Sequence, residues 1–186
     1  HDYQYGFALE VRNDNKFRFK VGSGGSTTNW LVASDTSSTN QWYHIACVVT
    51  PTQLELFVNG VSKGTESNSS LTPSFEKFFI GSRFYSSAPA DYFNGKIDET
   101  SMFDYDLSEA QVLEIYNNGR PKDLSTFSGT APISWWRLGE NAYFDNNAIT
   151  VPNSITEAHN GIGPESVTTM ISADARGTYA NCKGVG

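Results

Sequence analysis

The sequence predicts an all-β protein, a β-sandwich with one short helix near residues 108–118. The first observation is a series of short segments in which apolar and polar residues alternate, as in strands with one buried face. The second is the presence of turn residues between them, such as Asn59-Gly60. The third is that a single segment has the residues that mark the start and the end of a helix. A chain of 186 residues can bury one good core, or one core and part of another.

The first elements form a hairpin with one apolar and one charged face. Tyr5 to Val11 alternate between apolar and other residues, and after a turn at residues 13–15 the apolar Phe17, Phe19 and Val21 alternate with Lys and Arg. We expect the apolar side chains to face the core and the charged ones to face water.

Three strands follow in the central part of the chain. A short strand is expected near residues 30–33. Residues 41–50 are apolar on both faces and end at Pro51, which predicts a strand in the centre of a sheet. Residues 53–64 predict a second hairpin about Asn59-Gly60, a pair that tolerates the positive φ angles of a type I′ turn.

A strand and the helix come next. Residues 95–103 alternate as a half-buried strand. Ser108 and Gln111 have the spacing of a capping box, which predicts that the helix begins there. Gly119 and Pro121 end it. The buried stripe of the helix is expected from Ala110, Val112, Leu113, Ile115 and Tyr116.

Four motifs occur in a characteristic order: Gln41-Trp42-Tyr43-His44-Ile45-Ala46, Leu54-Glu55-Leu56-Phe57-Val58-Asn59-Gly60, Phe79-Ile80-Gly81, and Gly95-Lys96-Ile97-Asp98-Glu99 before the helix. This series resembles the laminin-G-like domains of the concanavalin A-like superfamily. The resemblance implies a concanavalin-like jelly-roll sandwich over residues 1–124, without the family's usual opening strands. Lectins, adhesion modules, glycosidases and virion proteins share this fold, so the fold does not choose among these functions.

The rest of the chain is expected to contain three parts. Residues 125–132 predict a linker, and residues 133–164 resemble the start of a laminin-G-like unit. Residues 165–186 are small and polar and predict an extended arm or connection. Either the strand at 133–138 completes the same sandwich, or the chain is a segment of a tandem array. We expect this strand to pair beside residues 95–103, because an isolated strand leaves its backbone unpaired.

Composition excludes some functions. The net charge of −7 disfavours nucleic acid, whose phosphates require clustered Lys and Arg. No apolar run is long enough to span a membrane. Cys47 is expected to be a small buried side chain, with a disulfide to Cys182 as the alternative. We expect no cofactor; the alternative is a Ca²⁺ ion held by oxygens of residues 13–15, Asp35 and Asp91, as in many family members.

Sugar binding requires exposed aromatic rings beside polar groups. The residues with this chemistry are Trp30, Arg83, Tyr85, Tyr92 and Asn94. The alternative is that these rings cap the edge of the sandwich. Trp135 and Trp136 are adjacent in a predicted strand, so one ring is expected to point inward and the other outward, where a neighbouring subunit can cover it.

No catalytic residues are expected. A glycosidase needs two carboxylates across a cleft, whereas Asp98 and Glu99 are adjacent on a predicted strand and point to opposite faces. Asp98 is expected to bond to nearby backbone. His44 is flanked by Tyr43 and Ile45 inside a strand, which favours a packed histidine.

The function predicted is therefore a non-catalytic jelly-roll module of a surface structural protein. The segment Trp135-Trp136-Arg137-Leu138-Gly139-Glu140 is similar to repeats in structural proteins of marine phages, which implies a virion component, either a capsid decoration or a fibre. Its partners would be copies of itself, other structural proteins or surface glycans, at the virion surface or outside a cell. The alternatives are a carbohydrate-binding adhesin of a cell surface and a polysaccharide-degrading enzyme.

Overall fold

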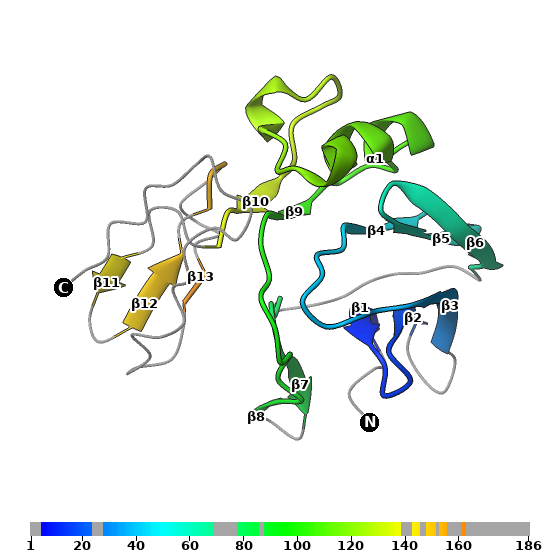
Figure 1. Cartoon of the computed structure of the whole chain (residues 1–186), viewed down its shortest axis with the longest axis horizontal. Coiled ribbons are helices and arrows are strands. Elements are labelled where there is room, and N and C mark those ends of the chain that lie inside the picture. Colours follow the sequence, from blue (N-terminus) through cyan, green and yellow to red (C-terminus); the bar gives the residue numbers. More distant parts are fainter. Residues whose placement is uncertain are drawn as a thin grey trace. The chain divides into compact units, whose positions relative to one another are not determined.

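The computed structural model describes residues 5–23, 28–68, 78–85, 88–138, 143–145, 148–151, 153–155 and 161–162. The chain forms two compact units, one of residues 1–93 with 106–122 and one of residues 94–105 with 123–186 (Figure 1). Each unit is described separately below.

The first unit contains two antiparallel three-stranded sheets. The first sheet has the order β1-β2-β3, and the second has the order β4-β5-β6. The described residues of the unit also form a two-stranded hairpin, one α-helix and one 3₁₀-helix. The bounds are β1 (Tyr5–Val11), β2 (Lys16–Ser23), β3 (Thr28–Thr36), β4 (Ile45–Val49), β5 (Gln53–Val58), β6 (Val61–Ser67), β7 (Arg83–Tyr85), β8 (Ala88–Ala90), α1 (Glu109–Tyr116) and the 3₁₀-helix η1 (Asn117–Gly119).

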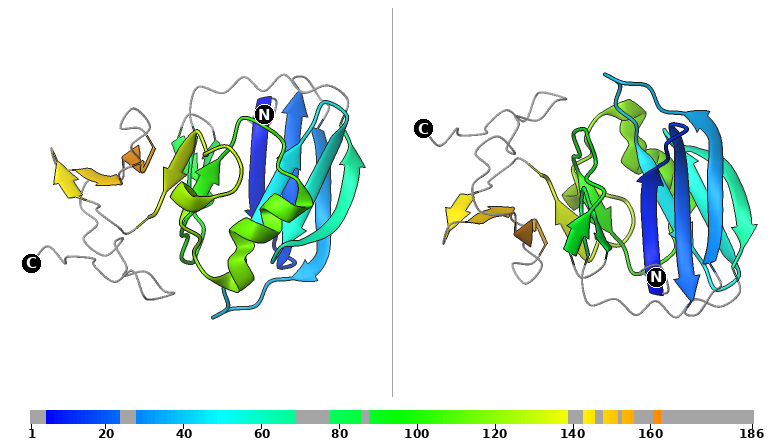
Figure 2. Two further views of the ribbon diagram at one scale, coloured as in Figure 1. Left: turned by 90° about the horizontal axis from the view of Figure 1, so that it is seen from above. Right: turned by 90° about the horizontal axis from the view of Figure 1, so that it is seen from below.

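The core of this unit lies between the two sheets, which face each other as a sandwich (Figure 2). It consists of Phe17, Phe19, Val21 and Ala33 from the first sheet with Leu54, Leu56 and Val58 from the second. Val48 and Phe57 of the second sheet pack with Val112 of α1, so the helix covers the other face of that sheet. The all-β sandwich with one short helix is thereby confirmed.

The hairpins follow the expected turn chemistry. Asn59 and Gly60 have φ angles of 54° and 77°, the positive values that a type I′ turn requires. In the first hairpin, Phe17, Phe19 and Val21 are buried as expected. Their register partners on β1 differ: Phe7 and Leu9 are 41% and 47% exposed. Among the described strands β1 pairs with β2 alone, and an edge strand has fewer neighbours to cover its side chains.

The expected position of residues 41–50 in the centre of a sheet is wrong. The strand begins at Ile45, and β5 rather than β4 is the middle strand of the described sheet. The apolar residues of β4 are instead covered on both faces, because Cys47 packs against the sandwich core and Val48 against the helix side. Coverage by two layers thus gave the sequence pattern of a central strand.

Helix α1 begins as predicted. The Ser108 Oγ accepts the N–H of Gln111 at 3.3 Å, and the Gln111 Oε1 accepts the N–H of Ser108 at 2.9 Å, which completes the capping box. The helix ends at Asn117, whose φ of 46° is left-handed and whose N–H bonds to the carbonyl of Leu113. The helix therefore stops two residues before Gly119, the expected end.

The second unit contains shorter elements. Its bounds are β9 (Thr100–Met102), the 3₁₀-helix η2 (Leu124–Thr126), β10 (Ser134–Trp136), β11 (Tyr143–Asp145), β12 (Ala148–Val151) and β13 (Gly161–Ile162). Antiparallel pairing of β10 with β9 joins Trp136 to Thr100 and Ser134 to Met102, so the pairing expected for residues 133–138 is confirmed. The strand expected at 95–103 is shorter because Glu99 has a φ of 51°, which interrupts extended backbone.

Residues 125–132, the predicted linker, contribute buried side chains to the second unit. Phe127 and Pro132 are buried, and the ring of Phe127 lies 5.6 Å from that of Phe103. The Tyr105 hydroxyl donates to the carbonyl of Thr130 at 2.9 Å. The predicted arm, residues 165–186, lies outside the described residues, and the expected division of the chain stays a prediction.

Candidate carbohydrate-binding surface

Trp30 is an exposed aromatic residue of the first sheet. It lies near the start of β3, where Leu31 packs on the core and Ala33 is buried. Because successive side chains of a strand point to opposite faces, Trp30 points away from the core. Its side chain is 56% exposed. An indole of this size in water is a large apolar surface available to a ligand.

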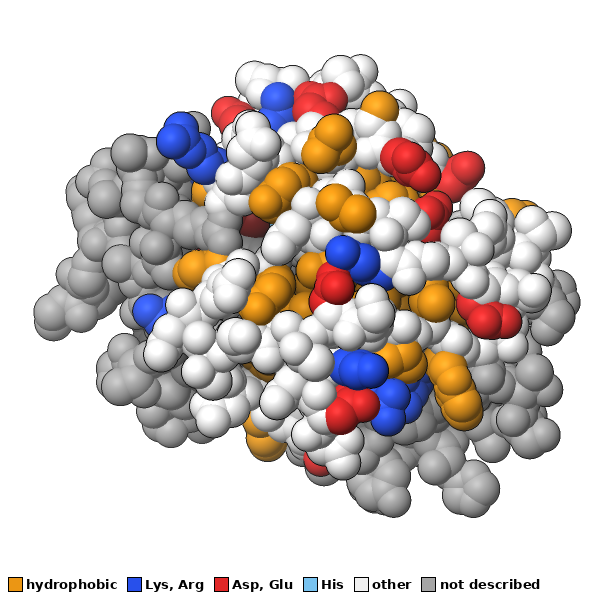
Figure 3. All heavy atoms as spheres, turned by 45° about the vertical axis from the view of Figure 1, so that its right-hand side comes forward, with side chains coloured by type: hydrophobic (Ala, Val, Ile, Leu, Met, Phe, Trp, Pro, Cys, Tyr) orange, Lys and Arg blue, Asp and Glu red, His pale blue; other side chains and the backbone are white. Residues whose placement is uncertain are grey.

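The outer face around Trp30 carries paired charges. Lys20 is the register partner of Trp30, and its Nζ lies 3.0 Å from the Glu10 Oε1. The same Glu10 oxygen accepts from the Nε of Arg18. Figure 3, which brings the β3 and β6 side of this unit forward, shows acidic and basic side chains beside one another with hydrophobic side chains between them. Glu10 thus balances much of the positive charge near the indole.

The strands β3 and β6 lie side by side, one from each sheet (Figure 2). The Asn29 Nδ2 donates to the Ser67 carbonyl at 3.1 Å. The Lys63 Nζ lies 2.6 Å from the Asp35 Oδ2 farther along the same pair of strands. We call this side of the sandwich the β3/β6 rim. Two polar contacts therefore hold it together near both of its ends.

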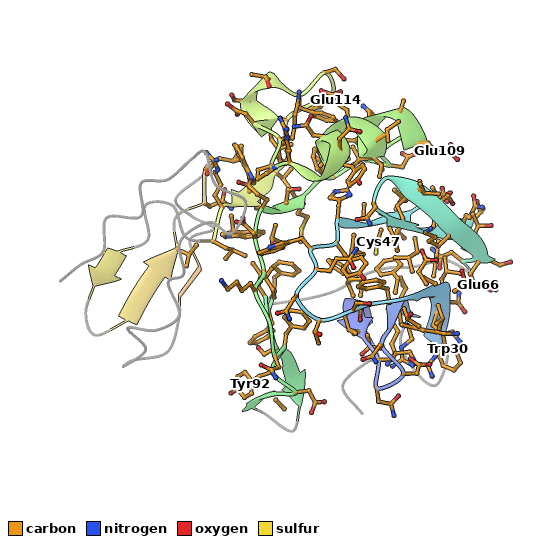
Figure 4. All side chains as sticks on the ribbon, in the orientation of Figure 1. Trp30, Cys47, Glu66, Tyr92, Glu109 and Glu114 are labelled. Atoms are coloured by element: carbon orange, nitrogen blue, oxygen red, sulfur yellow. The ribbon has the colours of Figure 1, made fainter. Side chains whose placement is uncertain are left out.

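A polar hollow of about 310 Å³ opens in the second sheet, where β5 begins and β6 ends. Figure 4 shows Trp30 and Glu66 at the β3/β6 rim. Asn68 closes the strand end beside the hollow, because its backbone N–H bonds to the Thr52 carbonyl at 2.8 Å and its side chain to the Thr50 carbonyl at 2.7 Å. The residues that line the hollow are Thr52, Gln53, Thr65, Glu66 and Ser67.

The other residues expected at a sugar site are not gathered around Trp30. Tyr92 is 73% exposed and lies after β8, and Figure 4 shows it on the opposite side of the first unit from Trp30. Asn94 is exposed and belongs to the second unit. Arg83 and Tyr85 are on β7, and their side chains lie outside the described part of the chain. The structure therefore separates Trp30 from Tyr92.

The hollow was not expected from the sequence. Its lining residues belong to two strands and the turn before one of them, and isolated Thr, Ser and Gln residues on strands are common on any polar face. The signal that could have found it is the pairing of Gln53 with Ser67 and of Glu55 with Thr65, which sets hydroxyl and amide groups on neighbouring strands. That register depends on the Asn59-Gly60 turn.

Trp135 and Trp136 are both buried, with 4% and 7% exposure, so the expectation that one ring points outward is wrong. The Trp135 indole donates to Glu99 Oε2 at 2.6 Å, and the Arg137 guanidinium lies 4.9 Å from the centre of its ring. The segment at Asn153 covers the free edge of β10 through a bridge to Trp136. The interface role predicted for the two residues depended on one exposed ring, and both rings are buried. That role stays a prediction.

The acidic residues of the second unit have structural contacts. The Asp98 Oδ1 accepts the N–H of Glu99 at 2.9 Å, which confirms the backbone bond expected for Asp98. Glu99 itself holds Trp135 and, at 3.2 Å, the Nε of Arg137. In the first unit, the ring of His44 packs 5.8 Å from that of Tyr116, as expected for a packed histidine. Asp98, Glu99 and His44 thus each make a contact within the fold that gives the residue a structural role.

Two further groups bear on metal and thiol chemistry. Within the described ranges, no three His, Cys, Asp or Glu side chains gather as they would around a metal ion. Asp35, one of the expected calcium ligands, is engaged by Lys63. Burial raises the pKa of the Cys47 thiol, which therefore stays protonated at neutral pH. Cys182 lies outside the described residues, and calcium binding stays a prediction.

The chain belongs to the concanavalin A-like lectin/glucanases superfamily, whose laminin G family model matches residues 1–113. This confirms the resemblance to laminin-G-like domains. No curated protein matches the chain. Among the described residues, no helix is both long and apolar enough to cross a membrane.

Two solved structures are similar. A protein of Bacteroides ovatus ATCC 8483 to which carbohydrate binding has been ascribed aligns over 87% of this chain and 47% of its own, with a TM-score of 0.61 and 14% identity. An S-layer domain-containing protein of Clostridium thermocellum ATCC 27405 aligns over 62% of this chain and 58% of its own, with a TM-score of 0.41 and 21% identity. The chain spans about half the length of these structures, and at these identities the likeness concerns the fold.

Proposed function

We propose that this chain is a non-catalytic carbohydrate-binding module of a surface or extracellular protein. The observation that carries the proposal is Trp30, an exposed indole on the outer face of the first sheet, with the charged side chains of Lys20 and Glu10 on the same sheet. A sugar ring offers C–H groups on its faces and hydroxyls at its rim, so it requires an apolar plate beside hydrogen-bonding groups.

The family and the fold support this function. The superfamily includes lectins, and the structural neighbour from Bacteroides ovatus has been ascribed carbohydrate binding. The absence of catalysis is supported by the engagement of Asp98 with backbone and of Glu99 with Trp135 and Arg137. A carboxylate held by two partners is poorly placed to exchange protons with a glycosidic bond.

A glycan array probed with the wild-type protein tests the proposal. We expect selective binding to a subset of glycans. A parallel assay for new reducing ends on the glycans that bind should give no turnover above a buffer control. An array without binding contradicts the carbohydrate-binding role, and sugar release abolished by Glu99→Gln contradicts the non-catalytic role.

The setting proposed for this module is the surface of a virion, as a capsid decoration or fibre component. It is supported by the resemblance of residues 135–140 to repeats of marine phage structural proteins. Mass spectrometry of purified particles should find many copies of the chain in each particle. Detection of the protein in cell envelopes but not in particles favours the alternative, a cell-surface adhesin.

A further inference from the structure

We propose that Asn94 is a site of spontaneous deamidation, at which the exposed Asn94-Gly95 pair becomes a mixture of aspartate and isoaspartate. The chain contains four Asn-Gly pairs, at residues 59–60, 94–95, 118–119 and 160–161. The structure describes both residues of the first three pairs and places these pairs in three different environments. This property of the covalent chain does not depend on the proposed function.

The reaction needs the chain and water alone. The backbone nitrogen of the glycine, after it loses its proton, attacks the side-chain carbonyl carbon of the asparagine. The new C–N bond closes a five-membered succinimide ring, and the side-chain nitrogen leaves as ammonia. Water then opens the ring at either carbonyl, which gives aspartate or isoaspartate. Glycine favours the first step because it has no Cβ to hinder the attack.

The Asn94-Gly95 pair meets the requirements of this reaction. Both residues are exposed and lie between β8 and β9, outside any helix or strand. Within the part of the chain that the structure describes, neither residue makes a hydrogen bond. The Gly95 nitrogen is therefore open to hydroxide, and it can approach the Asn94 side chain without the loss of a hydrogen bond.

The Asn59-Gly60 pair has the same two residues in a protected environment. The Asn59 Oδ1 accepts the N–H of His44 at 2.9 Å, and the Asn59 N–H donates to the His44 carbonyl at 2.8 Å. Both residues of the pair are half-buried, and helix α1 packs closely on Gly60. The attack at this pair requires the His44 bond to break and the turn to open, so we expect Asn59 to be protected.

The Asn118-Gly119 pair is intermediate between these two. Asn118 is exposed, but it lies within the 3₁₀-helix η1 with a φ of 54°. The N–H of Arg120 closes this turn on the carbonyl of Asn117 at 3.2 Å. Rotation of the backbone toward the attacking geometry opens the turn. Deamidation at Asn118 is therefore expected to be slower than at Asn94.

Deamidation at Asn94 changes both the charge and the backbone. Each event replaces a neutral amide by a carboxylate, so one negative charge is added to the formal net charge of −7. Isoaspartate also directs the main chain through its Cβ, which adds one atom to the backbone between Phe93 and Gly95. Asn94 is the first residue of the second unit, so both changes fall at the boundary between the units in the sequence.

Hydroxylamine at alkaline pH tests the proposal, because it cleaves the chain at the succinimide of an Asn-Gly pair. The full chain carries Asn160→Gln, which removes the pair whose asparagine lies outside the described residues, and fragments are identified by intact mass. In native buffer the first fragments should be residues 1–94 and 95–186. In denaturant all three remaining pairs should be cut at similar rates. Asn94→Gln should abolish the native cleavage, and the matched control Asn118→Gln, at another exposed asparagine, should leave it unchanged.

The ratio of native rates decides the outcome. Cleavage after Asn59 should be at least about tenfold slower than after Asn94, because the turn must open first. Native protein stored at mildly alkaline pH should also accumulate isoaspartate at residue 94, detected by an isoaspartate methyltransferase and peptide mapping. Equal native rates at the two pairs, or a stored sample without isoaspartate at residue 94, overturn the proposal. Circular dichroism in the same buffer verifies that the protein stays folded.

Discussion

Gly60 is the position at which one added methyl group would meet the helix. It has a φ of 77°, and a Cβ built there would lie 2.9 Å from the Leu113 Cδ1 and 2.9 Å from the Tyr116 Cδ1. Two requirements thus coincide at one residue. The type I′ turn needs a positive φ, and the close approach of α1 to the turn needs the absence of a side chain.

Gly60→Ala should therefore lower the free energy of unfolding by more than about 1 kcal/mol, as measured by chemical denaturation. In a Leu113→Ala background the cost should be smaller, because one of the two clashing atoms is removed. Leu113 is 54% exposed, so its own truncation should cost little. Strictly additive costs in this double-mutant cycle would mean that the helix does not crowd the turn.

Cys47 is the residue whose ionisation couples most clearly to folding. Burial raises the pKa of its thiol above the ordinary value of about 8.5, so the folded state holds the proton more tightly than the unfolded state does. The stabilisation from this difference is complete below about pH 8.5 and is lost as the pH rises above it, where the unfolded thiol ionises.

The rate of reaction with a thiolate-directed reagent measures this protection. In a Cys182→Ala background, the remaining thiol should react slowly at pH 8 in the native protein and rapidly in denaturant. The unfolding free energy of this protein should also exceed that of a Cys47→Ala variant by less at pH 10 than at pH 7. Equal labelling rates in native and denatured protein would contradict the burial of the thiol.

At the scale of elements, the β2 strand tests the register of the sandwich. Phe19 is 2% exposed and lies in the core formed by both sheets. Phe19→Ala should lower the unfolding free energy by about 3–5 kcal/mol. Ser34→Ala, at an exposed position of β3, should change it by no more than about 0.5 kcal/mol. If Phe19→Ala fails to fold, Phe19→Leu should preserve the order with a smaller loss. Similar costs for the two sites would contradict this register.

Elements whose ends are marked by nearby capping or turn residues were predictable from the sequence. The Ser108 and Gln111 pair sets the start of α1, and the Asn59-Gly60 pair sets the second hairpin, because both devices act within a few residues. Elements that depend on distant partners were predicted less well. Residues 95–99 alternate as a strand does, yet Glu99 adopts a φ of 51° while its side chain bonds to Trp135 and Arg137, which are distant in sequence.

At the scale of the whole molecule, the fold was predictable because family motifs mark its strands in order. The binding surface was only partly predictable. Trp30 was a candidate from its chemistry, and the structure confirms that it is exposed. The residues lining the hollow carry no motif, and they come together only through the pairing of β5 with β6. Trp135 and Trp136 appeared equivalent to Trp30 in the sequence, but their burial depends on contacts with residues 99, 137 and 153.

The most direct test of the account uses the indole signals of the four tryptophans. Nuclear magnetic resonance of ¹⁵N-labelled protein, with assignment by Trp→Phe variants, can follow each indole N–H during titration with an oligosaccharide selected on the glycan array. The account predicts a saturable shift of the Trp30 signal, while the signals of the buried Trp135 and Trp136 stay in place. Saturable binding that shifts backbone signals near Tyr92 and leaves the Trp30 indole unmoved would contradict it.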